Sequence, residues 1–92
     1  MIRIVASTHF IKFKKRASPK LQLEIDNQLK AILENPDIGE LKKGDLKGIR
    51  VLKFKFGHQE YLLSYEMGEK VLHLYIVGSH ENYYAKLKRY LH

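Results

Sequence analysis

Cysteine is absent from this sequence of 92 residues. The absence excludes a disulfide-stapled secreted fold, a thiol nucleophile and a zinc site with cysteine ligands. Long hydrophobic runs are also missing, since none approaches the roughly 18–20 apolar residues that a membrane span needs. The apolar residues 1–6 are too short for a signal peptide. We therefore expect one cytoplasmic domain spanning residues 1–92, with no membrane partner.

Recognised motifs for cofactors and metals are missing as well. The sequence has neither of the glycine-rich phosphate-binding patterns, GxxxxGKS/T and GxGxxG. Its five histidines show no HExxH or other metal-ligand spacing. Its serines lie outside any nucleophile elbow, so acyl transfer has no support. We expect no cofactor and no metal ion.

Positive charge is in excess and is unevenly distributed. Seventeen Lys and Arg side chains face ten Asp and Glu, which gives a formal net charge of +7. Residues 1–20 carry six basic side chains and no acid, residues 21–40 carry five acids and one lysine, and residues 41–55 carry six basic residues and one acid. This segregation predicts a basic surface for an anionic partner, although an ordinary solvated lysine-rich surface gives the same total.

Two helices are predicted in the first third of the chain. Phe10 and Phe13 lie three residues apart among basic side chains, which is typical of a short amphipathic helix with a cationic outer face. Ser18 and Pro19 fit the N-cap and the first position of a second helix, over residues 19–34. Its apolar residues recur every three or four positions until the next proline ends it.

The middle of the chain predicts a loop and then strands. Residues 38–48 contain three glycines, which indicates a loop with turn chemistry. Three strands follow, over residues 50–56, 59–65 and 71–77, and a hairpin turn at residues 67–70 joins the last two. The first two strands alternate between apolar and polar residues, whereas the third is nearly continuously apolar, as in a strand covered on both faces.

A last helix is predicted over residues 80–91, with Tyr84, Leu87 and Leu91 on its core face. With a short first strand at residues 1–6, the order is strand, helix, helix, three strands, helix. Short turns force neighbouring strands to be antiparallel. The sequence therefore predicts an α+β domain: a mostly antiparallel four-stranded sheet with two N-terminal helices packed on one face and a C-terminal helix.

Side chains able to act on RNA gather at two places. Lys53 and Lys55 share one face of a predicted strand, where they can hold a phosphate or stabilise its charge during cleavage. His80 follows the last strand, and an imidazole exchanges a proton near neutral pH. Tyr83 or Tyr84 can stack on an unpaired base, an interaction worth about 1–3 kcal/mol per base. Together these groups suit general acid–base cleavage of RNA with the 2′-hydroxyl as nucleophile and no metal.

Each of these groups also has a purely structural interpretation. His80 can cap the last helix, and Tyr84 can belong to the core with its apolar neighbours on that helix. Lys53 and Lys55 can be the solvated face of a strand, or can protect a sheet edge against aggregation.

Four segments of the sequence carry a family resemblance. They are Asn35-Pro36-Asp37-Ile38-Gly39, Leu46-Lys47-Gly48-Ile49-Arg50, Tyr61-Leu62-Leu63-Ser64-Tyr65 and Val77-Gly78-Ser79-His80. In this order and spacing they resemble toxins of the RelE/ParE superfamily, over essentially the whole chain. The resemblance implies the toxic half of a bacterial type II toxin–antitoxin module. RelE-like members cut messenger RNA in the ribosomal A site, whereas ParE-like members inhibit DNA gyrase and are not nucleases.

The resemblance also implies roles for individual residues. In the YafQ-like branch, the histidine of the glycine–small–histidine ending and the aromatic four residues later are functional, and they match His80 and Tyr84. Arg50 matches the arginine that follows leucine-lysine-glycine. Lys53 and Lys55 occupy the strand that carries basic groups in relatives. These five residues form the predicted catalytic set.

Three positions depart from the nucleases of this superfamily. Leu62 stands where many RelE-like nucleases have an arginine. Phe56 and Glu60 stand where the YafQ-like branch has a histidine and an aspartate. Loss of one general acid or base typically lowers a rate by about 10²–10⁴.

The first hypothesis is a ribosome-dependent messenger RNA endoribonuclease that inhibits translation. The residues predicted to bind RNA are Lys12, Lys14, Lys15, Arg16, Tyr83 and Lys86. The alternatives are a non-enzymatic inhibitor of DNA gyrase and a basic RNA-binding domain without toxicity. Under either toxin hypothesis, the expected partner is an acidic, partly disordered antitoxin that covers the basic groove.

Overall fold

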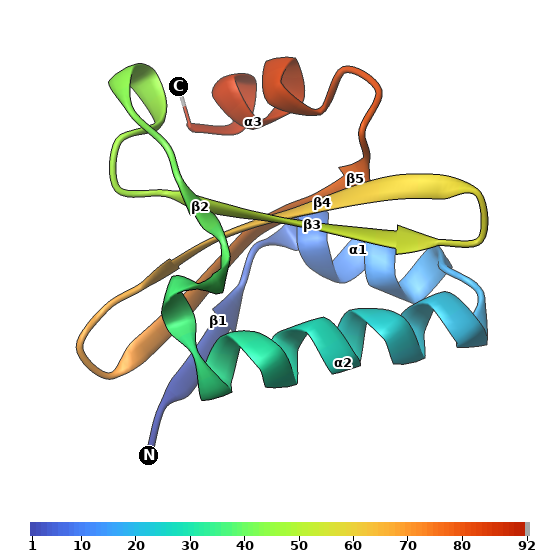
Figure 1. Ribbon diagram of the computed structural model, residues 1–92, viewed down its shortest axis with the longest axis horizontal. Coiled ribbons are helices and arrows are strands. Elements are labelled where there is room, and N and C mark those ends of the chain that lie inside the picture. Colours follow the sequence, from blue (N-terminus) through green and yellow to red (C-terminus); the bar gives the residue numbers. More distant parts are fainter. Residues whose placement is uncertain (92) are drawn as a thin grey trace.

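The computed structural model describes residues 1–91, which form a sheet with helices on both faces (Figure 1). The elements in chain order are β1 (Arg3–Ala6), α1 (Thr8–Arg16), α2 (Pro19–Glu34), a 3₁₀ turn η1 (Pro36–Ile38), β2 (Glu40–Leu41), a second 3₁₀ turn η2 (Gly44–Leu46), β3 (Arg50–Phe56), β4 (Gln59–Met67), β5 (Val71–Ser79) and α3 (Tyr83–Leu91). The predicted α+β class and order of long elements are confirmed.

Both N-terminal helices begin at a capping serine. Ser7 Oγ accepts a hydrogen bond from the Phe10 amide at 3.0 Å, and Ser18 Oγ accepts one from the Leu21 amide at 3.2 Å. Each serine satisfies an amide that has no partner within the helix, and Pro19 at the first position of α2 needs none. The bounds predicted for α2 are confirmed, and α1 begins two residues before Phe10.

The sheet has five strands within the described residues, in the order β1-β5-β4-β3-β2. β1 is parallel to β5, and the other neighbours are antiparallel. The prediction of four strands was wrong in this detail, because part of the expected loop over residues 38–48 pairs with β3. In that pairing Glu40 lies opposite Val51, and Leu41 lies opposite Arg50.

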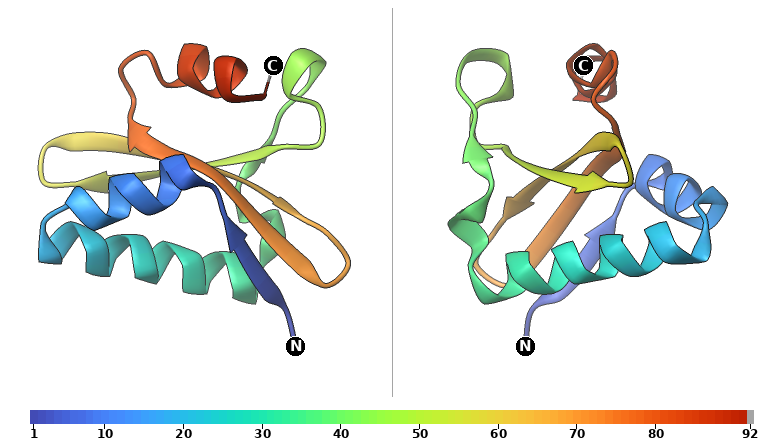
Figure 2. Two further views of the ribbon diagram at one scale, coloured as in Figure 1. Left: turned by 180° about the vertical axis from the view of Figure 1, so that it is seen from behind. Right: turned by 45° about the vertical axis from the view of Figure 1, so that its right-hand side comes forward.

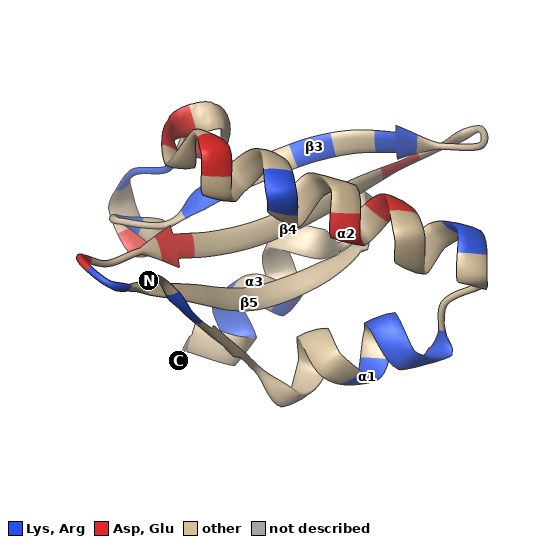
Figure 3. Ribbon diagram, turned by 90° about the horizontal axis from the view of Figure 1, so that it is seen from below, with Lys and Arg blue, Asp and Glu red and all other residues tan. Residues whose placement is uncertain are grey.

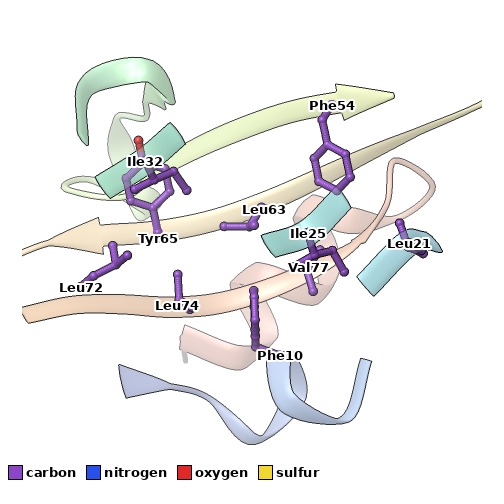
Figure 4. Packing of buried hydrophobic residues seen from close by; sticks show 10 residues of the cluster. All are labelled: Phe10, Leu21, Ile25, Ile32, Phe54, Leu63, Tyr65, Leu72, Leu74 and Val77. Carbon is purple, nitrogen blue, oxygen red and sulfur yellow. The ribbon is translucent and has the colours of Figure 1, made fainter. Parts of the chain in front are cut away.

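The larger hydrophobic core lies between the sheet and the helices α1 and α2, and Figure 4 shows its side chains meeting there. α1 and α2 contribute four of its buried residues, and the strands contribute the others. Its buried members are Phe10, Leu21, Ile25, Ile32, Phe54, Leu63, Tyr65, Leu72, Leu74 and Val77. Leu52 and Phe56 pack against the cluster as partly buried residues.

A smaller core lies on the opposite face, beneath α3. Its buried members are Leu46, Val51, Leu62, Ile76, Tyr83 and Leu87. α3 begins at Tyr83 and not at residue 80, because Asn82 adopts a left-handed backbone with φ of 57° that breaks the helix before it. The predicted core face is corrected in register: Tyr83 and Leu87 are buried, whereas Tyr84 and Leu91 lie partly buried at the margin.

The two faces of the sheet are therefore covered unequally. α1 and α2 cover one face, while α3 and the η2 segment rise from the other face (Figure 2). Within residues 1–91, no helix combines the length and the hydrophobicity needed to cross a membrane. In the following, "the α3 face" means the side of the sheet that carries α3.

Candidate active site

Strand β3 presents two lysines to solvent on the α3 face. Side chains alternate between the two faces of a strand, so Phe54 enters the larger core while Lys53 and Lys55 point the other way. Both lysines are exposed, whereas Val51, which shares their face, is buried under α3. The predicted pair of neighbouring cations is confirmed in its placement.

A histidine and a carboxylate lie beside Lys55. Lys55 is directly opposite Glu60 in the β3–β4 ladder. The His80 amide donates to the Glu60 carbonyl at 3.0 Å, which extends this row of residues to the end of β5. His80 Nε2 lies 3.8 Å from Glu60 Oε1, so the two side chains form an ion pair when His80 is protonated. The His80 side chain is 60 % exposed and accessible to a ligand.

The sequence comparison marked Glu60 only as a departure from the YafQ-like branch and did not include it in the predicted site. The β4–β5 register brings Glu60 to His80, and that register contains a shift between Leu63 and Tyr65 that no local sequence signal shows. Ser64 lies at the shift, where its Oγ accepts from the Ile76 amide at 3.1 Å and donates to the Ile76 carbonyl at 3.2 Å.

A second charged group borders the lysine pair at β2. Lys42 forms an ion pair with Glu40, and Lys42 Nζ lies 5.1 Å from the centroid of the Tyr84 ring. The hydrogen bond with Lys42 lowers the pKa of Glu40, and the charge of Lys53 adds to this effect. The same hydrogen bond raises the pKa of Lys42, with a further contribution from Tyr84. Tyr84 therefore lies on the α3 face next to cations, held by a cation–π contact.

Sequence reasoning also missed Glu40 and Lys42, because they lie in and directly after the short strand β2, which was predicted as loop.

Leu62 also belongs to the α3 face of the sheet. It lies opposite Lys53 in the ladder and is fully buried under α3. The position at which many RelE-like nucleases have an arginine is therefore occupied here by a residue of the smaller core.

The structure separates Arg50 from the other predicted catalytic residues. Arg50 Nη1 donates to the Gly39 carbonyl at 2.9 Å, and Nη2 lies 3.1 Å from Asp37 Oδ1. The neighbouring Tyr65 hydroxyl donates to the Pro36 carbonyl at 2.5 Å and accepts from the Gly39 amide at 3.0 Å. A Cβ at Gly39 would lie 2.8 Å from the Tyr65 ring. Arg50 therefore holds the segment after α2 against the sheet, and its expected catalytic position is corrected.

Tyr83 is likewise withdrawn from solvent. Its side chain is 1 % exposed, and its hydroxyl donates to the Ile76 carbonyl at 2.6 Å and lies 2.8 Å from Ser64 Oγ. Burial raises the pKa of Tyr83 well above its usual range. The ring cannot stack on a base in this position, so the expectation that Tyr83 binds RNA is replaced by a role in the smaller core.

The basic helices present their charges in different directions. Lys14 pairs with Asp26 of α2 at 2.5 Å. Lys12, Arg16 and Lys86 instead line a pocket between α1 and α3, which Lys14 and Lys15 do not line. Figure 3 shows the lysines and arginines on α1, β3 and α3, with the acidic residues concentrated on α2 and at the strand ends.

Taken together, the α3 face offers one proton-transfer group and several cations in reach of solvent. His80 with Glu60 can move a proton, while Lys53 and Lys55 can bind an anion beside them. Within the described residues, no three His, Asp or Glu side chains come together as metal ligands. This chemistry suits a phosphodiester substrate.

Comparisons with known proteins agree with the fold. Residues 4–88 match a family described as the ParE-like toxin of type II bacterial toxin–antitoxin systems. A chain of the intact Escherichia coli RelBE toxin–antitoxin complex superposes with a TM-score of 0.71 at 20 % identity, covering 88 % of this chain and 99 % of that one. No match was found among curated protein sequences.

Two further structures share the architecture. A mutant of the E. coli toxin RelE in the free state gives a TM-score of 0.73 at 16 % identity and covers 96 % of this chain and 90 % of that one. YafQ from E. coli BL21(DE3) gives 0.53 at 21 % identity and covers 87 % of this chain and 94 % of that one. These identities establish likeness of fold, while the family match covers most of the sequence. The chain therefore belongs to the ParE-like toxins of type II bacterial toxin–antitoxin systems, within the RelE/ParE superfamily.

Proposed function

We propose that this toxin is an endoribonuclease that cuts messenger RNA on the ribosome and so inhibits translation. The observation that carries the proposal is the His80–Glu60 pair, with Nε2 and Oε1 3.8 Å apart and Lys55 opposite Glu60 in the ladder. A proton-transfer group beside exposed cations is what cleavage of a phosphodiester requires.

The reaction uses the substrate's own nucleophile. The 2′-hydroxyl oxygen attacks the adjacent phosphorus, the bond from phosphorus to the 5′-oxygen breaks, and a 2′,3′-cyclic phosphate and a 5′-hydroxyl remain. The hydroxyl proton leaves on attack, and the departing 5′-oxygen gains a proton. Because His80 and Glu60 are only 3.8 Å apart, they act as one proton-transfer unit and not as an acid and a base on opposite sides of the phosphate. His80 accepts the 2′-hydroxyl proton as the neutral imidazole, Glu60 orients the ring and stabilises the imidazolium that forms, and solvent water gives the departing 5′-oxygen its proton.

The neighbouring side chains bind and position the substrate. Lys53 and Lys55 attract the phosphate and stabilise the negative charge that grows on it in the transition state. Tyr84 stacks on a base, and the cation–π contact with Lys42 holds its ring in place. Arg50 and Tyr83 have structural roles and take no part in this chemistry.

Two departures at the site motivate a second candidate function. Leu62 and Phe56 supply no charge where related nucleases carry an arginine and a histidine, and Leu62 is fully buried. A chain without those groups cuts RNA slowly, since each missing acid or base costs about 10²–10⁴ in rate. The competing function is inhibition of DNA gyrase through protein contacts alone.

The proposal extends to partner and location. An acidic antitoxin segment that orders on binding would cover the exposed lysines, and opposite charges would speed their association. Action on ribosome-bound messenger RNA places the toxin in the cytoplasm.

Induced expression followed by primer-extension mapping of messenger RNA tests the proposal. We expect discrete cleavage sites with the wild-type chain and cleavage about 10²–10⁴ slower with His80→Ala. His73→Ala is the matched control, because His73 is an exposed histidine near the opposite end of β5. Thermal melting confirms that all three proteins are folded.

The cleavage experiment and a gyrase supercoiling assay together separate the two functions. Intact messenger RNA in the presence of ribosomes, or unchanged cleavage by His80→Ala, would overturn the nuclease proposal. Loss of supercoiling by purified gyrase at saturating toxin, with RNA left intact, would establish the gyrase inhibitor instead.

A further inference from the structure

A pocket of about 810 Å³ lies between α1 and α3, away from the lysine pair of β3. We call it the α1–α3 groove. Its rim carries Lys12 and Arg16 from α1 and Lys86 and Arg89 from α3, and its floor includes Val77, Gly78 and Ser79 at the end of β5. Arg89 is not among the residues that the sequence alone predicted to bind RNA.

The charge of the groove is positive and unbalanced. Lys12 and Arg16 are four residues apart and Lys86 and Arg89 are three apart, so each helix places two cations on one side. All four are exposed, and within the described residues none forms an ion pair and no Asp or Glu lines the groove. Among residues 1–91 these cations have no anionic partner, so the groove can attract solvent anions or an anionic ligand.

Aromatic rings close one end of the groove. His9 of α1 and Tyr90 of α3 meet edge to face, with ring centroids 5.2 Å apart and planes at 87°. Tyr90 is 39 % exposed, so part of this residue is in contact with solvent. A groove that combines cations with exposed aromatic rings is typical of surfaces that bind single-stranded nucleic acid.

The position of α1 disfavours a peptide strand in this groove. β1 ends at Ala6, and α1 takes its place alongside the second half of β5, as Figure 3 shows. The Ser7 amide donates to the Leu74 carbonyl, and Ser7 Oγ donates to the Tyr75 carbonyl, which ties the start of α1 to β5. An added strand would have to displace this helix before it reached the backbone of β5.

The groove also leads to the proposed active site. Gly78 and Ser79 are part of its floor, and the next residue is His80. We propose that the α1–α3 groove binds the phosphate backbone of single-stranded RNA next to the nucleotides that lie at His80. The inference rests on the proposed nuclease function, since it assigns the path of that substrate beyond the lysine pair.

Binding of a substrate that cannot be cut tests the groove separately from catalysis. The probe is a fluorescent 12-nucleotide 2′-O-methyl RNA, which lacks the nucleophilic hydroxyl. The test variant is Arg16→Ala/Arg89→Ala. The control is Lys20→Ala/Lys88→Ala, which removes the same charge from exposed positions that do not line the groove. Fluorescence anisotropy over a range of salt concentrations gives the affinity and its salt dependence.

The expected result is a change in the salt dependence for the groove variant alone. The slope of log affinity against log salt should become less negative by about 0.7 for each phosphate that the protein no longer neutralises, or about 1.4 for the double variant. The control should keep the wild-type slope. Equal slopes for the two variants, or no RNA binding by the wild-type chain, would overturn the proposal.

Further outcomes separate this inference from the function on which it rests. If the groove variant binds RNA more weakly than its control while His80→Ala cuts normally, the groove stands and the nuclease mechanism fails. If the groove variant binds like its control while the wild type cuts RNA, the groove proposal fails alone. Binding of a polyglutamate peptide with the same dependence on Arg16 and Arg89, without binding of RNA, would assign the groove to an acidic protein segment and overturn it.

Discussion

The two faces of the sheet differ in how they are covered and in the charge they expose, although they are made by the same strands. On one face, α1 and α2 pack four buried residues against six from the strands to form the larger core. On the other, α3 and the η2 segment pack three buried residues against three from the strands. The remaining area presents Lys53, Lys55, Glu60 and His80 to solvent. One face holds the larger part of the hydrophobic core, and the other leaves charged side chains exposed.

This difference shows how a small chain combines stability with a charged site. Lysines close together on an exposed strand repel each other and contribute little to folding. The opposite side of the same strand compensates, because Phe54 lies between Lys53 and Lys55 in the sequence and enters the larger core. Substitutions on the face covered by α1 and α2 should therefore mainly lower stability. Substitutions of the exposed charged residues on the α3 face should mainly lower activity.

The largest expected effect on stability belongs to the face covered by α1 and α2, called the sealed face below. Ile25 is fully buried, so Ile25→Ala should lower the free energy of unfolding by about 2–5 kcal/mol. Leu23→Ala on the same helix is the control, because Leu23 is 60 % exposed and its loss should cost less than about 0.5 kcal/mol. Urea denaturation measures both. Similar costs for the two variants would show that α2 does not pack as described.

Arg50→Ala is the next largest and separates structure from catalysis. Loss of the charge-assisted bonds to Gly39 and Asp37 should cost about 1.5–3 kcal/mol of stability. Cleavage per folded molecule should stay close to wild type, since Arg50 lies on the sealed face. Arg50→Lys should recover only part of the stability, because lysine lacks the planar fork. A large loss of cleavage with unchanged stability would return Arg50 to the active site.

The separation of Arg50 from the lysine pair is predictable from the sequence. The alternation that puts Phe54 on one face of the strand and Lys53 on the other also puts Arg50 on the face of Phe54, because they are four residues apart. The helix over residues 19–34 was predictable because its cap, its proline and its apolar spacing all agree.

Other parts of the site depend on tertiary pairing and have no local signal. β2 is two residues long, too short for any periodicity, and it forms only because β3 offers an edge. Glu60 meets His80 through the β4–β5 register, which shifts between Leu63 and Tyr65. In α3, the left-handed Asn82 delays the helix start and turns Tyr83 into the core in place of Tyr84.

Tyr83→Phe tests the smaller core under α3. Loss of the hydroxyl removes the hydrogen bonds to Ile76 and Ser64, which should cost about 1–3 kcal/mol. Burial raises the pKa of Tyr83 in the folded state. Up to the usual tyrosine pKa of about 10, both states hold the proton, and stability does not depend on it.

Above that pH, the unfolded state loses the Tyr83 proton while the folded state keeps it, so stability falls as the pH rises. One proton corresponds to about 1.4 kcal/mol per pH unit. Tyr83→Phe should therefore lose stability less steeply than wild type between about pH 10 and 11.5. Urea denaturation at several pH values measures the slopes. Identical slopes would mean that Tyr83 is accessible to water in the folded protein.

The smallest expected effect on stability, and the sharpest contrast between the faces, belongs to Lys55→Ala. Lys55 is exposed, so its removal should change the free energy of unfolding by less than about 0.5 kcal/mol. Cleavage should nevertheless fall by about 10²–10³, as expected when a group that stabilises transition-state charge is lost. Lys30→Ala is the control, since Lys30 is also an exposed lysine but lies on α2. If the two variants cut RNA at the same rate, the cations of the α3 face contribute only to solubility. The assignment of activity to the α3 face and of stability to the opposite face would then be wrong.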